Sequence, residues 1–263
     1  MMKPVVLAAV ALTALCGTAF GADMSARPAK VAAPPPVPLV NWTGPYIGLG
    51  LGARVLDTDW TSTATFDPGG GAIAPFTDPN ASITSTALRV SAYAGYNWQI
   101  NPSWLWGLEA DVGWAKNKER ADRIPGLGVV NAGSFAEVEG DWDASLRARL
   151  GTLLSPTLLA YVTGGVAVQR FEATATCPGD TFVCNPAFGF QSFSSSKTRF
   201  GWTIGVGLEA LLSAHCLARV EYRYADFNDF SFVAIPPTVT TFGANASLSS
   251  TSHIVTAGLA WKL

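Results

Sequence analysis

The feature that most constrains the fold is a two-faced segment at residues 88–100. Its apolar residues alternate strictly with polar or small ones, and the apolar set is Leu88, Val90, Ala92, Ala94, Tyr96, Trp98 and Ile100. A period of two places this set on one face of a β-strand. Arg89 with Ser, Gly, Asn and Gln residues forms the other face. A polar inner face opposite an apolar face that ends in aromatic residues is typical of a strand whose outside contacts lipid.

Seven more segments repeat this pattern, at residues 46–55, 104–114, 141–150, 158–170, 199–209, 218–224 and 255–263. Short turns at 101–103, 155–157 and 213–215 alternate with long connections at 56–86, 117–137, 171–198 and 226–251. Long connections are unusual in compact soluble domains but are expected outside a membrane barrel. The spacing therefore predicts an all-β fold: an eight-stranded antiparallel transmembrane up-and-down β-barrel with short periplasmic turns and four long extracellular loops.

The N-terminal region predicts export. Lys3 precedes an apolar run that is too short to span a bilayer, and Ala19 and Gly21 fit a cleavage site with Ala22 as the first mature residue. We expect a signal peptide at 1–21, a Pro/Ala-rich periplasmic linker at 22–41 and an outer-membrane barrel at 42–263. In an oxidising compartment, Cys177 and Cys184 are candidates for a disulfide.

The inward-facing positions carry charges of both signs in nearly equal numbers. An eight-stranded barrel is only wide enough for side chains to fill, and isolated buried charges are costly. The sequence therefore predicts a lumen plugged by a network of paired charges. We assign to it Arg54, Arg89, Glu109, Asp111, Asp141, Asp143, Arg147, Arg149, Arg199, Glu209, Arg219, Glu221, Arg223 and Lys262. A small porin is the alternative, and it would need a wider lumen or one dominant sign of charge.

Two motifs resemble a known family. The segment Trp42-Thr43-Gly44-Pro45-Tyr46-Ile47-Gly48 is similar to the start of Omp25/Omp31-like outer-membrane proteins of alphaproteobacteria, which are grouped with opacity-type and OmpA-type eight-stranded barrels. The segments at 161–165 and 220–224 resemble the family's fifth and seventh strands. The resemblance implies an abundant structural protein of a Gram-negative cell outer membrane that contacts lipid and lipopolysaccharide and displays antigenic loops. Some relatives bind haemin, and the family is often labelled porin.

The C-terminal strand resembles the signal that barrel-assembly machinery reads. Its matching residues are Thr256, Gly258, Trp261 and Leu263. The chain departs from the family pattern because it ends in Leu where the family has Phe. The barrel-assembly machinery is thus a predicted partner.

Other functions have weaker support in the sequence. The net charge of −2 offers no basic excess for nucleic acid. A lipid A-modifying enzyme would need a His beside a Ser and a carboxylate, for which His253 with Ser250 and Ser252 is the candidate and His215 lies in the wrong turn. Haemin binding would use aromatic residues of two long connections: Phe182, Phe188, Phe190 and Phe193, and Phe227, Phe230, Phe232 and Phe242. The simpler interpretation is that the strands extend above the membrane and these rings pack between hairpins. We predict no enzyme activity and no cofactor or metal.

Overall fold

The computed structural model describes residues 41–66, 71–73, 78–126, 133–177, 189–235 and 243–263. The signal peptide at 1–21 and nearly all of the linker at 22–41 fall outside these residues, so both stay predictions. In the part of the chain that the structure describes, no helix is long and apolar enough to cross a membrane.

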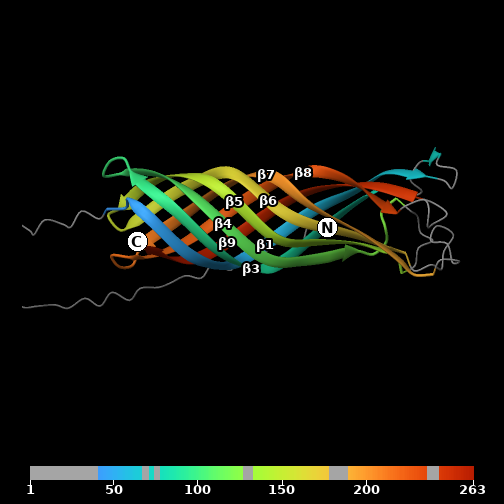
Figure 1. Ribbon diagram of the computed structural model, residues 1–263, viewed down its shortest axis with the longest axis horizontal. Coiled ribbons are helices and arrows are strands. Elements are labelled where there is room, and N and C mark those ends of the chain that lie inside the picture. The colour runs from blue at the N-terminus through green and yellow to red at the C-terminus, as the bar shows by residue number, and fades with distance from the viewer. Residues whose placement is uncertain (1–40, 67–70, 74–77, 127–132, 178–188, 236–242) are drawn as a thin grey trace, which may run out of the picture. The chain divides into compact units, whose positions relative to one another are not determined.

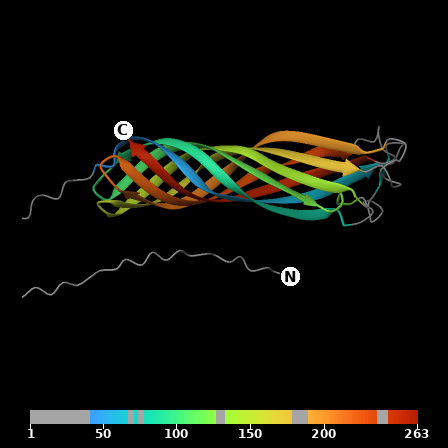
Figure 2. The same cartoon turned by 90° about the horizontal axis from the view of Figure 1, so that it is seen from below.

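The described chain forms long antiparallel strands. They are β1 (Gly44–Phe66), the two-residue β2 (Ala72–Ile73), β3 (Asn80–Gln99), β4 (Trp104–Ala121), β5 (Phe135–Ser155), β6 (Leu158–Cys177), β7 (Gln191–Leu211), β8 (Cys216–Ile235) and β9 (Gly243–Lys262). Each long strand pairs with its sequence neighbours, and β9 pairs with β1 along almost its full length, from Lys262 opposite Tyr46 to Gly243 opposite Phe66. This last ladder closes the ring (Figure 1, Figure 2). The predicted eight-stranded antiparallel barrel is confirmed.

A lipid-facing belt encircles the barrel along the half of its length that lies next to the short turns. Its side chains are large, apolar and about half exposed, among them Leu49, Val90, Leu108, Leu146, Val206 and Leu259. Tryptophans lie at its borders, and Trp98 of β3 stacks on Trp106 of β4 with ring centroids 4.3 Å apart near a short turn. Apolar side chains flanked by aromatic residues match the hydrocarbon core of a bilayer and its interfaces. Burial inside lipid would convert this exposed apolar surface into a stabilising contact.

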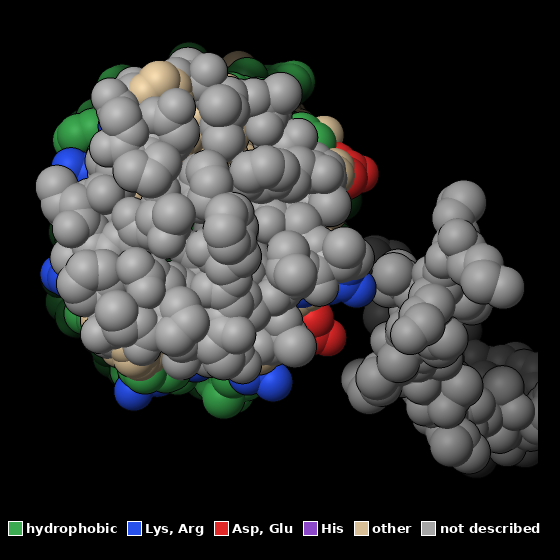
Figure 3. Space-filling view, turned by 90° about the vertical axis from the view of Figure 1, so that its right-hand side faces the viewer, with side chains coloured by type: hydrophobic (Ala, Val, Ile, Leu, Met, Phe, Trp, Pro, Cys, Tyr) green, Lys and Arg blue, Asp and Glu red, His purple; other side chains and the backbone are tan. Residues whose placement is uncertain are grey.

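The strands continue beyond the belt, so most of the predicted long loops are strand. In β1 the belt ends near Val55; after it, Asp57 and Asp59 point outward while Leu56 and Trp60 point inward and are almost fully buried. Polarity is thus inverted along a single strand. Figure 3 views the barrel from this end, where acidic and basic side chains are both visible around the rim.

The interior of this upper section is an apolar cluster. Trp60 meets Phe232 edge-to-face with centroids 5.1 Å apart, and Phe171 contacts Phe227 in the same way at 5.4 Å. The cluster comprises Leu56, Trp60, Ile83, Ile124, Ala136, Val138, Ala167, Phe171, Ala173, Ala175, Cys177, Ala225, Phe227, Phe230, Phe232, Ala234, Ile235, Ala244, Ala246 and Leu248. The rings of β8 therefore pack inward, as the simpler interpretation of the sequence held.

Two ladders end at the top of the belt although their strands continue. Pairing of β3 with β4 stops at Arg89 opposite Ala115, and pairing of β7 with β8 stops at Gly201 opposite Phe227. The upper section consequently divides into two sheets, β8-β9-β1-β3 and β4-β5-β6-β7, that diverge at the right of Figure 1. The apolar cluster draws residues from both sheets, so above the belt the barrel becomes a sandwich around an apolar core.

Truncation of Phe171 tests whether this cluster stabilises the barrel. Phe171→Ala removes a fully buried ring and leaves a cavity, so we expect a loss of about 3–5 kcal/mol of unfolding free energy. Phe200→Ala is the matched control because Phe200 is 67% exposed on the outer face. Urea unfolding of the refolded protein, followed by heat-modifiable gel migration, measures both. Equal effects of the two substitutions would contradict a packed upper core.

Candidate functional site

The candidate site is the charged lumen inside the belt. Its buried charges are six arginines and five carboxylates among the described residues: Arg54, Arg89, Arg147, Arg149, Arg219 and Arg223, and Glu109, Asp111, Asp143, Glu209 and Glu221. Strand alternation aims all of them inward, and register brings opposite signs together, since Glu109 of β4 lies directly opposite Arg147 of β5. Such charges are stable in an interior only when paired and hydrogen-bonded.

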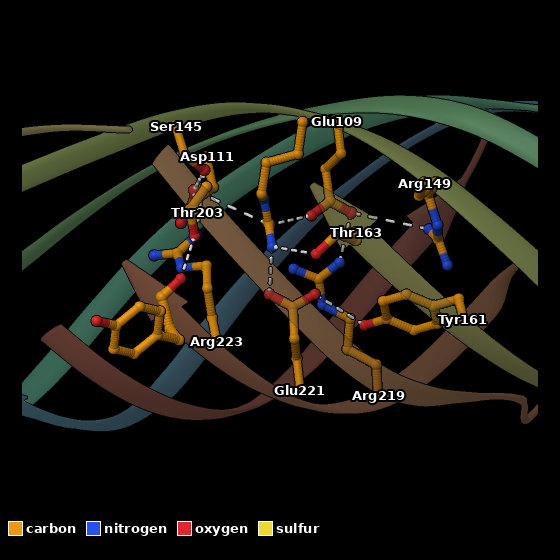
Figure 4. Close-up of polar contacts among 12 residues, drawn as sticks. Glu109, Asp111, Ser145, Arg149, Tyr161, Thr163, Thr203, Arg219, Glu221 and Arg223 are labelled. Atoms are coloured by element: carbon orange, nitrogen blue, oxygen red, sulfur yellow. Dashed lines mark hydrogen bonds and ion pairs between the residues drawn. The ribbon is translucent and has the colours of Figure 1, made fainter. Parts of the chain in front are cut away.

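The centre of the network is Arg147, whose side chain is fully buried. One guanidinium nitrogen lies 2.5 Å from Glu109 Oε1 and the other lies 2.6 Å from Glu221 Oε1. Arg219 approaches the second oxygen of Glu109 at 2.5 Å (Figure 4). Residues of β4, β5 and β8 therefore meet across the lumen. The contacts of β8 with β4 and β5 link strands that do not neighbour one another in the sheet.

A second group lies nearer to the apolar cluster. Arg89 binds Asp143 through two nitrogens, with Nε 2.8 Å from Oδ1 and Nη2 2.7 Å from Oδ2. The same Nη2 also lies 2.7 Å from Asp111, and Arg223 reaches that carboxylate from β8 at 2.6 Å. Ser145 donates a short hydrogen bond to Asp111. A Cβ at Gly113 would lie 2.2 Å from the Arg89 guanidinium, so only glycine allows this approach.

Arg54 belongs to this group mainly through neutral partners. Its Nε donates to Asn117 Oδ1 at 2.7 Å, and its Nη2 donates to the backbone oxygens of Ala115 and Asp141 at 2.7 and 2.9 Å. Asp143 lies farther away, at 3.5 Å. Charge-assisted hydrogen bonds to carbonyl groups thus satisfy this buried cation.

Aromatic residues fill the rest of the lumen at the end of the barrel that carries the short turns, here called the turn end. The Arg149 guanidinium lies 5.4 Å from the Tyr46 ring and 4.2 Å from the Tyr161 ring, and Tyr46 Oη donates to Glu109 at 2.8 Å. Arg219 lies 3.4 Å from the Tyr93 ring. These rings fill space that charged side chains leave and add cation–π attraction.

Trp42 covers the lumen mouth at the turn end. Its side chain is 2% exposed, its backbone N–H donates to Gln99 Oε1, and its indole N–H donates to Pro156 O at 3.1 Å. It belongs to an apolar cluster with Tyr46, Tyr93, Leu105, Leu159, Tyr161, Leu217 and Ala260. The segment 42–48 thus has a physical role in closing this end.

Three predicted network residues lie elsewhere. Asp141 is exposed on the outer face, because the register shift between Gly140 and Asp143 in β5 reverses the alternation. Arg199 lies at the top of β7 over the Phe230 ring at 4.6 Å and joins no ion pair with a described residue. Lys262 donates to the backbone oxygen of Asn41 near the turn end. The inward orientation assigned to Asp141 was wrong, and the network is smaller than the sequence suggested.

Sequence reasoning missed the ring system and Asn117. Tyr93 and Tyr161 stood on the polar face of the alternation, which signalled inward tyrosines, but nothing in the sequence paired them with arginines. The Nδ2 atom of Asn117 donates to the backbone oxygens of Arg54 and Ser85 at 3.1 and 3.0 Å. The sequence reasoning ended this strand at Trp114 and placed Asn117 in a long connection, although the in–out alternation of β4 continues through Ala115 to Asn117.

Outside the belt, Lys118 forms an exposed pair. Its Nζ lies 2.8 Å from Glu137 and 2.5 Å from Glu139. Hydrogen bonds to the two carboxylates raise the pKa of Lys118, and the bond from Lys118 lowers the pKa of Glu139. Solvent screens such exposed pairs, so we expect little effect on stability.

The residues of the enzyme alternative do not assemble. Ser250 and Ser252 point into the barrel and are buried, whereas His253 points outward. Its ring contacts the Tyr222 hydroxyl at 2.8 Å and lies 3.8 Å from Asp57. His253 and the two serines therefore lie on opposite faces of β9. His215 stacks on Trp261 in a short turn.

The structure describes only some of the residues on which the haemin and disulfide predictions rest. Phe190 is exposed and Phe193 is partly buried, while Phe182, Phe188 and Phe242 fall outside the described residues. Cys184 also falls outside them, so the pairing with Cys177 stays a prediction. Within the described ranges, no cluster of His, Cys, Asp and Glu could hold a metal ion.

Comparison with known proteins decides the family. A model of the outer membrane protein β-barrel domain matches residues 12–261. This chain belongs to that family. It is 31% identical to the 25 kDa outer-membrane immunogenic protein of Brucella canis over 88% of this chain and 87% of that protein. It is 28% identical to the 31 kDa outer-membrane immunogenic protein of Brucella melitensis, over 99% and 100% of the two chains. The Omp25/Omp31-like resemblance and the outer-membrane location are thereby confirmed.

Other similarities agree. The 22 kDa outer membrane protein of Rhizobium leguminosarum is 29% identical over 73% of this chain and 68% of that protein. Among solved structures, the outer membrane protein OprG of Pseudomonas aeruginosa matches with a TM-score of 0.52 and 17% identity, covering 84% of this chain and 96% of OprG. The likeness to OprG concerns the fold alone.

Removal of Arg147 tests the network. Arg147→Met removes the only arginine that pairs with Glu221 among the described residues and one of the two arginines 2.5 Å from Glu109, so we expect a loss of about 3–5 kcal/mol in unfolding free energy. The triple variant Arg147→Met, Glu109→Gln, Glu221→Gln removes the unpaired charges and should recover part of that loss. Lys118→Met, at the exposed pair, is the control and should change little. Denaturant unfolding in detergent measures all three; a neutral Arg147→Met would contradict a network that stabilises the barrel.

Proposed function

We propose that this protein is a structural, surface-exposed outer-membrane β-barrel whose lumen is sealed and whose upper section and loops are displayed outside the cell. The observation that carries the proposal is the filled interior, in which paired charges within the belt are followed by an apolar core above it. In this role the barrel anchors a surface in the outer leaflet and contacts lipid and lipopolysaccharide.

Two barriers in series support a sealed lumen. The guanidinium groups of Arg147 and Arg149 are fully buried, and their contacts extend to several strands. A hydrated ion would have to displace these pairs and then cross the apolar core, where it finds few polar groups. A small porin would instead need an open path with a dominant charge, and the buried charges nearly balance. We therefore favour the structural role over the porin alternative.

Surface display is supported by polarity and by the relatives. Many outward-facing residues above the belt are polar, as Asp57, Asp59 and Lys118 illustrate, and suit an aqueous face. The Brucella relatives are named immunogenic outer-membrane proteins, and we infer a similar exposed surface here. Burial of Phe227, Phe230 and Phe232 leaves fewer rings for a haemin site and disfavours that alternative.

Assembly fits the C-terminal strand. Trp261 is 54% exposed on the lipid side, and Thr256 points inward. We propose that this alternation with Gly258 and the terminal Leu263 is the segment that barrel-assembly machinery recognises. No catalytic role is proposed, because the faces of β9 separate His253 from the serines.

Conductance tests the seal. In planar bilayers we expect no large, stable current steps from the purified protein. A variant with Glu109, Arg147, Arg219 and Glu221 all replaced by Ser should also remain closed, because the apolar core persists. Addition of Phe171→Ala and Phe227→Ala should produce steps. Heat-modifiable migration verifies folding of each variant. Large, stable steps from the unmodified protein would overturn the sealed lumen.

Epitope insertion tests the orientation of the barrel. A tag inserted after Gly133, in the connection between β4 and β5, should be stained by antibody on intact cells. The same tag after Ser213, in a short turn, should be stained only after the outer membrane is permeabilised. The reverse pattern would invert the proposed topology.

A further inference from the structure

The upper part of β7 is a regular sheet edge that is open on one side. From Ser192 to Phe200 it pairs with β6 without a register shift, Ser192 lying opposite Thr176 and Phe200 opposite Val168. On its other side the ladder to β8 ends at Gly201, and no described strand pairs with residues 192–200. About half of the backbone N–H and C=O groups of an edge strand face away from its partner. This edge can therefore accept another strand.

The other sheet edges of the upper section are protected. At the gap between β3 and β4, Asn117 reaches across and donates to the backbone oxygen of Ser85. On β8, register shifts at Phe227/Phe230 and Val233/Ile235 distort the edge that faces β7. Bulges and bridging side chains are the usual means of blocking strand addition. The edge of β7 has no register shift and no side-chain hydrogen bond across the gap to a described residue, and the segment from Ser192 to Phe200 contains no proline.

The inner face beside this edge lacks its covering layer. No residue between Ser192 and Phe200 is buried, whereas the inward residues Phe171, Ala173 and Ala175 of the paired strand β6 are fully buried. Phe193 packs against the border of the apolar cluster. The sandwich is therefore incomplete beside β7, and an added strand would find room on its inner face.

The charge of this inner face indicates what such a strand carries. Lys197 and Arg199 lie two residues apart on the inward side, and neither forms an ion pair with any residue in the described ranges. The Arg199 Nε atom is buried and donates no hydrogen bond to a described residue, while its guanidinium lies over Phe230 across the gap. A desolvated guanidinium gains most from a carboxylate. Two carboxylates at alternate positions of an added strand would match both cations.

We propose that the edge of β7 from Ser192 to Phe200 binds an extended, acidic segment of a partner protein by strand addition. Backbone hydrogen bonds to β7 supply affinity, and carboxylates at alternate positions next to Lys197 and Arg199 supply selectivity. An apolar side chain of the added strand, four residues from the carboxylate next to Lys197, lies next to Phe193. Because these residues lie above the lipid-facing belt, the partner is extracellular if the barrel has the proposed orientation.

Peptide binding tests this site in the full-length protein refolded in detergent. The probes are the fluorescein-labelled peptide Glu-Thr-Glu-Thr-Ser-Thr-Val and its reversed sequence, which cover both strand directions. Fluorescence anisotropy at low salt should show saturable binding of at least one of them. Lys197→Glu with Arg199→Glu should weaken it by about tenfold or more, and a peptide with Lys in place of Glu should bind this variant instead. Arg170→Glu, an exposed cation on the outer face of β6, should bind like the unmodified protein.

Two measurements separate strand addition from simple charge attraction. Two methylated peptides are made, one with N-methyl groups on the odd-numbered amides and one with N-methyl groups on the even-numbered amides. Both keep their charge but lose backbone donors, so at least one of them should fail to bind. Hydrogen exchange in the free protein should be fast at those amides of residues 192–200 that face away from β6, and peptide should protect them. Equal binding of all methylated peptides, absence of saturable binding, or protection in the free protein of the amides that face away from β6 would overturn the proposal. None of these outcomes depends on whether the lumen conducts.

Discussion

The narrow interior of an eight-stranded barrel is the constraint on which the rest of this structure depends. Such a ring holds side chains and little else, so every inward charge must have a partner within reach. Arg147 meets Glu109 and Glu221 from two directions, and Arg89 holds Asp143 and Asp111 together. The pairs of Arg147 with Glu221 and of Arg89 with Asp143 connect non-adjacent strands through the lumen. The barrel wall and its interior therefore stabilise one another, which favours a structural role over transport.

A second principle is the reversal of polarity along each long strand. In the belt the outside is apolar because it contacts lipid, and the charged inside is satisfied by its own pairs. Above the belt the outside is largely polar, and Leu56, Trp60 and Phe171 fill the inside. The same strands thus have the polarity of a membrane barrel within the belt and the polarity of a water-exposed β-sandwich above it. The change coincides with the two places where the ladders end.

The alternating pattern was sufficient to predict the strands within the belt, their number and the direction of nearly every inward charge, because a period of two leaves no freedom once lipid fixes the outer face. It failed at Asp141, where a bulge reverses the alternation. It also predicted loops where the strands continue, since residues such as Leu56 and Trp60 carry an inverted pattern that does not extend the belt's alternation. The pairing partners of each arginine were beyond reach of the sequence.

The sequence by itself determined that this is an outer-membrane barrel with a charged interior, because local alternation and turn spacing are properties of short segments. The tertiary structure decided which charges meet, where Trp42 closes the lumen, and that the upper section splits into two sheets around an apolar core. Those features depend on strand register and on contacts between residues such as Arg219 and Glu109, which lie far apart in the chain. Contacts of that kind are set by closure of the ring, which no single segment encodes.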